Sequence, residues 1–192
     1  MKHLTINDRK VEFDNEKNLL EVVRKAGIDL PTFCYHSELS VYGACRMCIV
    51  EDDRGKIFTS CSTIPRTGMK VFTNTPRIRK YRKTILELLL SNHDKDCTSC
   101  HLTGACELQK LSRRFGLEDV RFEQTIKNET IDVSSHAIKR NPNKCIYCGD
   151  CVRVCEEIQG VAALSLTHRG SDIKISPAFD KKIGEVNCVD CG

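Results

Sequence analysis

Thirteen cysteines in 192 residues constrain this chain more than any other feature of its sequence. A disulfide scaffold of that density belongs to an oxidising compartment, whereas the N-terminal residues MKHLTINDRKVEF contain no apolar signal region. The sequence also lacks a run of 18 consecutive apolar residues, so it predicts no membrane span. We therefore interpret the cysteines as metal ligands rather than as disulfide partners.

The first 73 residues predict a small mixed α/β unit. Residues 3–7 and 10–13 alternate in hydrophobicity, as two short strands joined by a turn would. Residues 18–26 repeat their apolar positions with a helical period, and Gly27 ends that pattern. A long loop follows, and three more strands are predicted at residues 48–52, 56–61 and 69–74.

Thr75 and Pro76 predict the start of a longer helix, because Thr is a favoured N-cap and Pro a favoured first helical residue. The helix is expected to run to about Asn92, with an apolar face made of Ile78, Tyr81, Ile85, Leu88 and Leu89. We interpret the basic residues near its start as a solvated face, with a docking face for an acidic partner as the alternative. These are Arg77, Arg79, Lys80, Arg82 and Lys83.

Beyond this helix, cysteine-rich and polar segments alternate. Residues 93–116 are rich in cysteine and end in a predicted short helix, CELQKLSRRFG. Residues 117–140 are polar and are interpreted as a connector. Asn141-Pro142-Asn143 is a turn signal, and residues 144–192 form a second cysteine-rich unit. In that unit the C-x2-C pair of Cys145 and Cys148 recurs at Cys188 and Cys191.

The first group of candidate ligands has the spacing C-x10-C-x2-C-x12-C. Its close pair lies in YGACRMC, where Gly43 and Ala44 leave room for a cofactor beside the backbone. Four thiolates from a loop and a strand suit a [2Fe-2S] cluster, as a variant of the plant-type spacing. A four-Cys zinc site also fits the count, but such sites usually show two close pairs. The [2Fe-2S] ligands are predicted to be Cys34, Cys45, Cys48 and Cys61.

A second group lies in NHDKDCTSCHLTGAC, where three cysteines fall within ten residues and need a fourth ligand. We assign that role to His93; His101 is the rival, but its adjacency to Cys100 would make it a strained ligand. One His in place of a Cys leaves a [4Fe-4S] cluster with one negative charge fewer, which should raise its reduction potential. The predicted ligands are His93, Cys97, Cys100 and Cys106.

The run CIYCGDCVRVC has the spacing C-x2-C-x2-C-x3-C of bacterial ferredoxins, whose fourth Cys serves the other of two [4Fe-4S] clusters. Glu156 replaces the Pro that usually follows. A second run is therefore expected, and the C-x2-C pair near the end of the chain would begin it. A zinc ribbon on the two C-x2-C pairs would leave two cysteines unused. The candidate ligands are Cys145, Cys148, Cys151, Cys155, Cys188 and Cys191.

The ligand count leads to an expectation about the length of the protein. Four clusters with four ligands each need sixteen, whereas thirteen cysteines and His93 provide fourteen. The missing two would be the third and fourth Cys of the last run, beyond Gly192. We therefore expect the chain to be an N-terminal part of a longer protein, in which two of three [4Fe-4S] clusters take one further ligand each.

The overall charge gives little information about partners. The formal net charge is +4 when every Cys counts as a neutral thiol, but a ligating Cys is a thiolate. The basic balance is therefore no evidence for a nucleic-acid partner, and we predict none. No G-x-G-x-x-G or P-loop pattern is present, and no paired carboxylates or Ser/His/Asp set stands out. We expect no nucleotide site and no catalytic residues on this chain.

These motifs together resemble the N-terminal iron–sulfur arm of [FeFe]-hydrogenases. The chain is most similar to the arm of the catalytic subunit in the NAD(P)-linked, electron-bifurcating type. The large iron–sulfur subunit of respiratory complex I and NAD-dependent formate dehydrogenases carry a similar arm. The matching stretches are CYHSELSVYGACRMCIVE, ILELLLSNHDKDCTSCHLTGACELQ and KCIYCGDCVRVCEEIQGV.

The resemblance implies an α+β chain with three cluster domains. These are a β-grasp 2Fe-2S ferredoxin-type domain at 1–74, a 4Fe-4S domain with one His and three Cys ligands at 75–116 and, after a connector at 117–140, a truncated two-cluster ferredoxin-like domain at 141–192. The implied cofactors are one [2Fe-2S] and three [4Fe-4S] clusters, with the catalytic H-cluster only in a domain absent from this chain. The implied partners are a flavin- and NAD(P)-binding subunit, a small thioredoxin-like 2Fe-2S subunit and ferredoxin.

The expected function is electron relay within a hydrogenase, in a reducing cytoplasm that protects oxygen-sensitive clusters. A formate dehydrogenase or a complex I-like dehydrogenase is the alternative parent. The hypothesis from another class is a structural metal-binding module that mediates protein interactions. A redox titration separates the two classes, because structural zinc gives no reducible signal.

Overall fold

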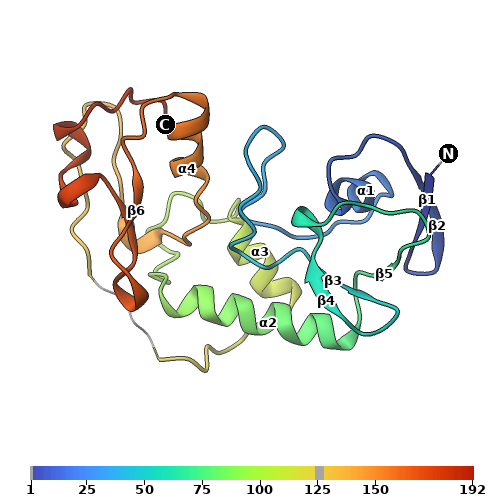
Figure 1. The fold of residues 1–192 in the computed structure, drawn as a ribbon. Coiled ribbons are helices and arrows are strands. Elements are labelled where there is room, and N and C mark those ends of the chain that lie inside the picture. Colours follow the sequence, from blue (N-terminus) through green and yellow to red (C-terminus); the bar gives the residue numbers. More distant parts are fainter. Residues whose placement is uncertain (1, 124–127) are drawn as a thin grey trace.

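A computed structural model describes residues 2–123 and 128–192 of the chain. The N-terminal sheet lies at the right of Figure 1 and the C-terminal segment at the left. Two helices, α2 (Pro76–Ser91) and α3 (Glu107–Arg114), lie between them. The cysteine-rich segments predicted from the sequence are distributed over all three parts.

A hairpin begins the chain, as the alternating pattern predicts. It joins β1 (Lys2–Ile6) to β2 (Arg9–Phe13) in antiparallel register. The two turn residues, Asn7 and Asp8, have positive φ angles of 49° and 64°. Positive φ at both positions gives a two-residue turn a twist that matches its strands, and Asn and Asp tolerate that conformation.

The other three predicted strands complete a mixed sheet. β5 (Lys70–Phe72) pairs parallel with β1 and antiparallel with β3 (Ile49–Asp52). β4 (Ile57–Thr59) pairs antiparallel with β3 at the edge of the sheet. The strand order is β2-β1-β5-β3-β4. The predicted strand at 56–61 ends early, because Ser60–Ser62 turn into a 3-10 helix.

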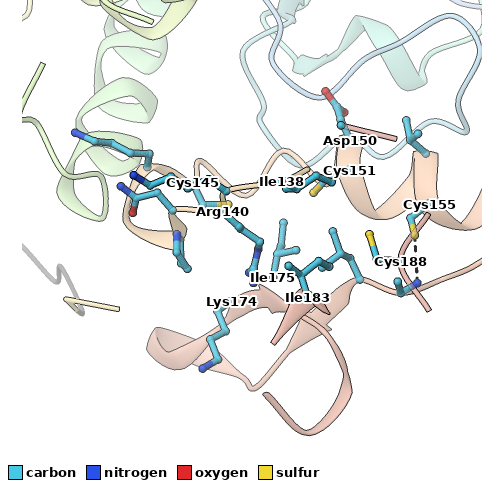
Figure 2. A pocket seen from close by; sticks show the side chains of 18 of the residues that line it. Ile138, Arg140, Cys145, Asp150, Cys151, Cys155, Lys174, Ile175, Ile183 and Cys188 are labelled. Atoms are coloured by element: carbon cyan, nitrogen blue, oxygen red, sulfur yellow. Dashed lines mark hydrogen bonds between the residues drawn. The ribbon is translucent and has the colours of Figure 1, made fainter. Parts of the chain in front are cut away.

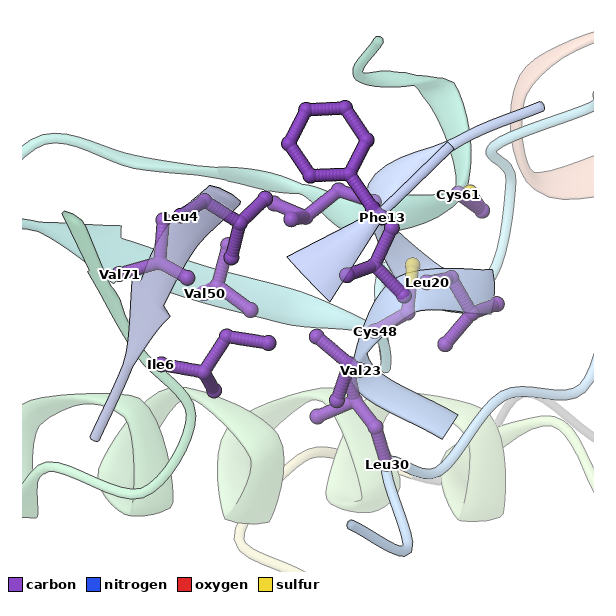
Figure 3. Close-up of a cluster of buried hydrophobic side chains, with 12 residues drawn as sticks. Leu4, Ile6, Phe13, Leu20, Val23, Leu30, Cys48, Val50, Cys61 and Val71 are labelled. Carbon is purple, nitrogen blue, oxygen red and sulfur yellow. The ribbon is translucent and has the colours of Figure 1, made fainter. Parts of the chain in front are cut away.

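Helix α1 (Leu19–Lys25) covers this sheet, and its buried face forms the first core. The side chain of Asn18 caps the helix by accepting a hydrogen bond from the N–H of Glu21 at 3.1 Å. Figure 3 shows apolar side chains of the helix and the strands meeting in one cluster, which also contains Cys48 and Cys61. The core residues drawn and labelled there include Leu4, Ile6, Leu20, Val23, Val50 and Val71.

Helix α2 starts where the sequence predicts, but a different face of it is buried. Thr75 accepts a hydrogen bond from the N–H of Ile78 at 3.2 Å, which confirms the N-cap. Ile78, Arg82 and Leu86 form the buried stripe, at a spacing of four residues. The predicted face is wrong at Tyr81 and Leu88, which are 43% and 48% exposed.

The interpretation of the basic residues as a solvated face is also wrong at one position. Arg82 is only 3% exposed, and its guanidinium donates hydrogen bonds to the carbonyls of Met47 (3.0 Å), Ile49 (2.6 Å) and Thr73 (2.9 Å). Burial lowers the pKa of Arg82 to about 10. The buried cation is retained because it satisfies three backbone carbonyls of the sheet domain.

Helix α3 forms a second core with α2. Leu108 and Leu111 from α3 pack with Leu86 from α2, and the same cluster contains Cys34 and Cys45 from the sheet domain. The predicted short helix at 106–116 is therefore confirmed, with Cys106 as its N-cap residue. This second core joins the helices to the cysteine-bearing loop of the first domain.

The C-terminal segment is built mostly of turns. Helix α4 (Asp150–Arg153) continues into a π-helical turn, Val154–Ile158. β6 (Ser165–Thr167) and β7 (Lys174–Ser176) form a separate antiparallel pair. Part of the predicted connector, residues 124–127, lies outside the described residues. Short 3-10 turns occur at Pro142–Lys144, Gly170–Asp172, Ala178–Asp180 and Ile183–Glu185.

Candidate iron–sulfur sites

The four cysteines of the predicted [2Fe-2S] site are all buried. Cys34 and Cys45 lie in the loop between α1 and β3, Cys48 immediately precedes β3, and Cys61 lies in the 3-10 turn after β4. Their exposed fractions are 1%, 7%, 1% and 1%, in chain order. Two belong to the second core and two to the first, so the site lies between the two cores.

The thiols of this site interact in two pairs. A hydrogen bond with Cys34 lowers the pKa of Cys45 to about 5, and the same bond raises the pKa of Cys34. A hydrogen bond with Cys61 lowers the pKa of Cys48 to about 6, while the pKa of Cys61 is raised. The two pairs also interact electrostatically with each other. One thiol of each pair is thus readily ionised, as metal ligation requires.

Backbone amides support the sulfur atoms at this site. The N–H of Phe33 donates to Sγ of Cys45, and the N–H of Cys45 donates to Sγ of Cys34, both at 3.4 Å. Hydrogen bonds to ligand sulfur stabilise its negative charge and tune the potential of a bound cluster. The four thiols therefore fit a cofactor held by four thiolates, and Cys34, Cys45, Cys48 and Cys61 would hold it.

The second predicted site lies between α2 and α3. His93 follows the end of α2 and is half-buried, whereas its rival His101 is exposed. Nδ1 of His93 is buried and has no hydrogen-bond partner within residues 2–123 and 128–192. Burial, together with the nearby Lys144 cation, lowers the pKa of His93 and keeps the imidazole neutral. A neutral, buried imidazole with an unpaired nitrogen fits a metal ligand.

A lysine of the C-terminal segment holds the loop that carries His93. The ammonium of Lys144 donates to the carbonyls of Asp94 (2.9 Å) and Asp96 (2.8 Å), and it pairs with the carboxylate of Asp94 at 2.9 Å. Lys144 immediately precedes Cys145. The loop between His93 and Cys97 is thereby fixed against the start of the third cysteine group.

The third group surrounds a cavity of about 510 Å³. Figure 2 shows Cys145, Cys151, Cys155 and Cys188 around it, with Ile138, Ile175 and Ile183 forming apolar walls. Cys191 also lines the cavity. Five cysteines from both predicted runs thus reach one cavity with largely apolar walls, an arrangement that fits ligands of an iron–sulfur cofactor.

Amide groups again point at the sulfur atoms. The N–H of Tyr147 donates to Sγ of Cys145 at 3.4 Å, and the N–H of Ala163 donates to Sγ of Cys155 at 3.1 Å. The N–H of Asp190 donates to Sγ of Cys188 at 3.5 Å. Burial raises the pKa of the Cys145 and Cys151 thiols. Without a cation, these thiols would be protonated, so positive iron would have to displace their protons.

Cys148 departs from this arrangement. It does not line the cavity with the other members of its run but packs against the second core, and burial raises its pKa to about 11. The backbone around it is held in left-handed conformations, with φ of 55° at Tyr147 and 75° at Gly149. Its role as a ligand stays a prediction.

Within the described parts of the chain, no group of three or more His, Cys, Asp or Glu side chains is arranged to hold a single metal ion. Ligands of one zinc ion meet at a common point about 2.3 Å from each sulfur. Cluster ligands bind different iron atoms, so their sulfur atoms need not share such a point. No helix in the same ranges has the length and apolar character that a membrane crossing requires.

Comparison with protein families assigns each part of the chain to an iron–sulfur model. Residues 1–76 match a 2Fe-2S iron–sulfur cluster binding domain, and residues 82–121 match the NADH-ubiquinone oxidoreductase-G iron–sulfur binding region. Residues 135–191 match the ferredoxin-like domain of NADH-quinone oxidoreductase subunit 3. Three successive parts of this chain are thus similar to iron–sulfur binding regions, two of which are named for subunits of NADH oxidoreductases.

Curated relatives of the arm are oxidoreductase subunits. The NADH-ubiquinone oxidoreductase 78 kDa subunit of Neurospora crassa is 37% identical over 183 residues, which are 94% of this chain and 25% of the relative. The NADP-reducing hydrogenase subunit HndD of Solidesulfovibrio fructosivorans is 34% identical over an aligned length of 195 residues, and the match covers 98% of this chain and 33% of the relative. The arm thus spans only a quarter to a third of these proteins' length.

A solved structure shares the fold of the arm. It is a chain of an NAD+-reducing [NiFe]-hydrogenase in the H2-reduced state, with a TM-score of 0.90 and 29% sequence identity. The match covers 97% of the present chain and 80% of that chain. The relation to hydrogenases and to complex I-type enzymes, expected from the sequence motifs, is therefore confirmed at the level of the arm.

Sequence reasoning missed three cationic residues beside these sites. Arg82 binds the carbonyls on both sides of Cys48, and Lys144 binds the loop after His93. Arg153, on α4, is 6% exposed and reaches the carbonyl of Cys34. The only available signal was the position of Lys144 and Arg153 within or next to the ferredoxin-type run; nothing near Arg82 in the sequence marks it.

Proposed function

We propose that this chain relays single electrons among bound iron–sulfur clusters within a multisubunit oxidoreductase. The observation that carries the proposal is the buried group of Cys34, Cys45, Cys48 and Cys61, in which four thiols lie in two pairs between two apolar cores. Iron–sulfur clusters, when bound, supply one-electron redox chemistry. The protein's residues bind them, exclude water and orient amide groups toward the sulfur atoms.

The proposed cofactors follow the three groups of ligands. The mixed sheet with its covering helix supports a β-grasp [2Fe-2S] domain over residues 1–74. The half-buried His93, whose Nδ1 is buried and unpaired among the described residues, supports a [4Fe-4S] site with one His and three Cys ligands within 75–116. The five-cysteine cavity supports one or both of the two [4Fe-4S] clusters proposed for residues 141–192.

As the parent enzyme we propose an NAD(P)-linked hydrogenase, which the similarity to two NAD(P)-linked hydrogenase chains supports. We propose the [FeFe] type, electron bifurcation and a separate H-cluster domain from the sequence resemblance alone. The solved relative is a chain of a [NiFe]-hydrogenase. A complex I-like dehydrogenase is the second candidate, because curated relatives include subunits of NADH-ubiquinone oxidoreductase. The proposed partners are a flavin- and NAD(P)-binding subunit, a thioredoxin-like 2Fe-2S subunit and ferredoxin, in a cytoplasmic complex.

An anaerobic redox titration of the purified chain, followed by electron paramagnetic resonance (EPR), tests the relay function. A reducible [2Fe-2S] signal and at least one reducible [4Fe-4S] signal are expected. Bound zinc with no reducible signal would instead identify a structural metal module and refute the proposal. Hydrogen-dependent reduction of NAD+ or NADP+ by the native complex tests the parent enzyme; NADH-dependent quinone reduction without hydrogen uptake would favour the dehydrogenase.

A further inference from the structure

Arg153 connects two of the candidate cluster sites. It lies on α4 between Cys151 and Cys155, yet its guanidinium reaches the loop of the sheet domain that carries Cys34 and Cys45. It donates to the carbonyl of Cys34 at 2.7 Å, to the carbonyl of Ser40, and to the carboxylate of Asp150 at 2.5 Å. Through hydrogen bonds to two backbone carbonyls, this one side chain therefore connects two segments that carry predicted ligands.

The surroundings of Arg153 form a built site rather than a chance contact. Its side chain is only 7% exposed, and a buried cation is stable only when its partners compensate for lost hydration. Asp150 provides a negative charge, and the ring of Tyr42 lies 5.4 Å from the guanidinium carbon in a cation–π arrangement. Gly149 leaves space for that ring, since a Cβ there would approach Tyr42 Cε1 at 2.8 Å.

A second residue of the C-terminal segment binds the same loop. The carboxylate of Glu157 accepts hydrogen bonds from the N–H of Ser40, at 2.8 Å, and from its hydroxyl. Arg153 and Glu157 thus bind the carbonyl and the amide of the same residue, as two sides of a clamp. Of these two residues, only Arg153 also reaches the carbonyl of a predicted [2Fe-2S] ligand, Cys34.

We propose that Arg153 is a positioning residue that clamps the Cys34–Arg46 loop to the C-terminal segment and raises the reduction potential of the [2Fe-2S] cluster. The second half of this inference rests on the proposed function; the clamp itself does not. A fixed positive charge beside Cys34 favours the more negative, reduced form of a cluster bound there. The fork of the guanidinium fixes the loop because it holds two carbonyls and a carboxylate at once.

Three variants separate these contributions. Arg153→Met removes the charge and all donors but keeps an apolar side chain of similar length. Arg153→Lys keeps the charge without the fork. Arg114→Met is the matched control: Arg114 also bridges from a helix to the sheet domain, donating to the carbonyl of Asp29 at 3.2 Å, but it is an exposed residue and Asp29 is not a predicted ligand.

The assays are hydrogen exchange of the loop amides and EPR-monitored potentiometry, both on the full chain with its clusters under anaerobic conditions. Arg153→Met is expected to speed exchange in residues 34–46 at least about tenfold, the equivalent of ~1.4 kcal/mol, and to lower the potential of the [2Fe-2S] signal. Arg153→Lys is expected to keep the potential of the [2Fe-2S] signal close to that of the wild type, but to lose most of the protection of the loop amides from hydrogen exchange. Arg114→Met should change neither.

Each outcome decides between the alternatives. Unchanged loop exchange in Arg153→Met, relative to Arg114→Met, would overturn the clamp, and an unchanged potential would overturn the tuning role. If Arg153→Met does not fold, the Arg153→Lys variant tests the clamp. Unchanged hydrogen exchange of the loop in that variant would refute the claim that the guanidinium holds the loop in place. If the wild-type chain has no reducible [2Fe-2S] signal, the proposed function fails, whereas the exchange data still decide the clamp.

Discussion

Replacement of Arg82 by Met is the most direct test of how the helices support the first cluster site. The three hydrogen bonds of Arg82 end on the carbonyls of Met47, Ile49 and Thr73, and the first two residues flank Cys48. Arg82→Met leaves all three carbonyls buried without this donor. The variant should therefore destabilise the whole chain and, in particular, the segment that positions Cys48.

The magnitude follows from the number of orphaned carbonyls. Each buried acceptor left unsatisfied costs ~1–3 kcal/mol, and the buried Met recovers part of this because no guanidinium must be desolvated. A net cost of ~1 kcal/mol per carbonyl gives ~3 kcal/mol in total. For a chain of this size, 1 kcal/mol shifts the Tm by roughly 2–4 °C, so we expect the Tm to fall by roughly 6–12 °C.

The assay is thermal unfolding of the anaerobically purified chain by circular dichroism, with Arg79→Met as the matched control. Arg79 lies on the same helix and is exposed, so its replacement should change the stability by no more than about 0.5 kcal/mol. A Tm for Arg82→Met within about 2 °C of the control would refute the reasoning. It would mean that the three carbonyls find other partners at little cost.

Three further predictions concern the ligands and the loop next to them. His93→Cys should keep a [4Fe-4S] cluster but lower its potential, because a thiolate adds negative charge; unchanged potentials in a titration would show that His93 is not a ligand. Cys48→Ala should abolish only the [2Fe-2S] EPR signal, and loss of a [4Fe-4S] signal instead would contradict the grouping. Gly149→Ala should lower the Tm by roughly 2–8 °C, because a left-handed Ala costs ~1–2 kcal/mol; Gly149 has φ of 75° and lies close to Tyr42. An unchanged Tm would contradict that last prediction.

Local sequence signals predicted most of the secondary structure. The hairpin turn at Asn7 and Asp8, the first helix ended by Gly27 and the Thr75-Pro76 helix start all depend on residues close to one another in the chain. The cysteine spacings likewise indicated three iron–sulfur regions, each of which matches a family model. These features could be predicted because the chemistry that determines them is contained within a few residues.

The features that the sequence did not reveal depend on contacts between distant segments. Arg82 looks like its neighbours in a basic run, and only the carbonyls of residues 47, 49 and 73 distinguish it. Arg153 is buried because a loop more than a hundred residues earlier supplies its acceptors. The orientation of Cys148 is similarly set by packing against the second core. A periodic pattern carries no information about such partners.

The cysteines of the first and third candidate sites differ in burial, which affects how the proposed iron–sulfur clusters would be inserted. All four cysteines of the first candidate site are at most 7% exposed, and two of them pack in one core with residues of α2 and α3. Cys151 and Cys191, in contrast, are exposed at the rim of the third site. A cluster donor can therefore approach the third site in the folded chain, whereas the first site must be filled before the helices close or during a local opening. For the clusters proposed above we therefore expect an order of insertion, in which the cluster at the first site enters first or at the rate of that local opening.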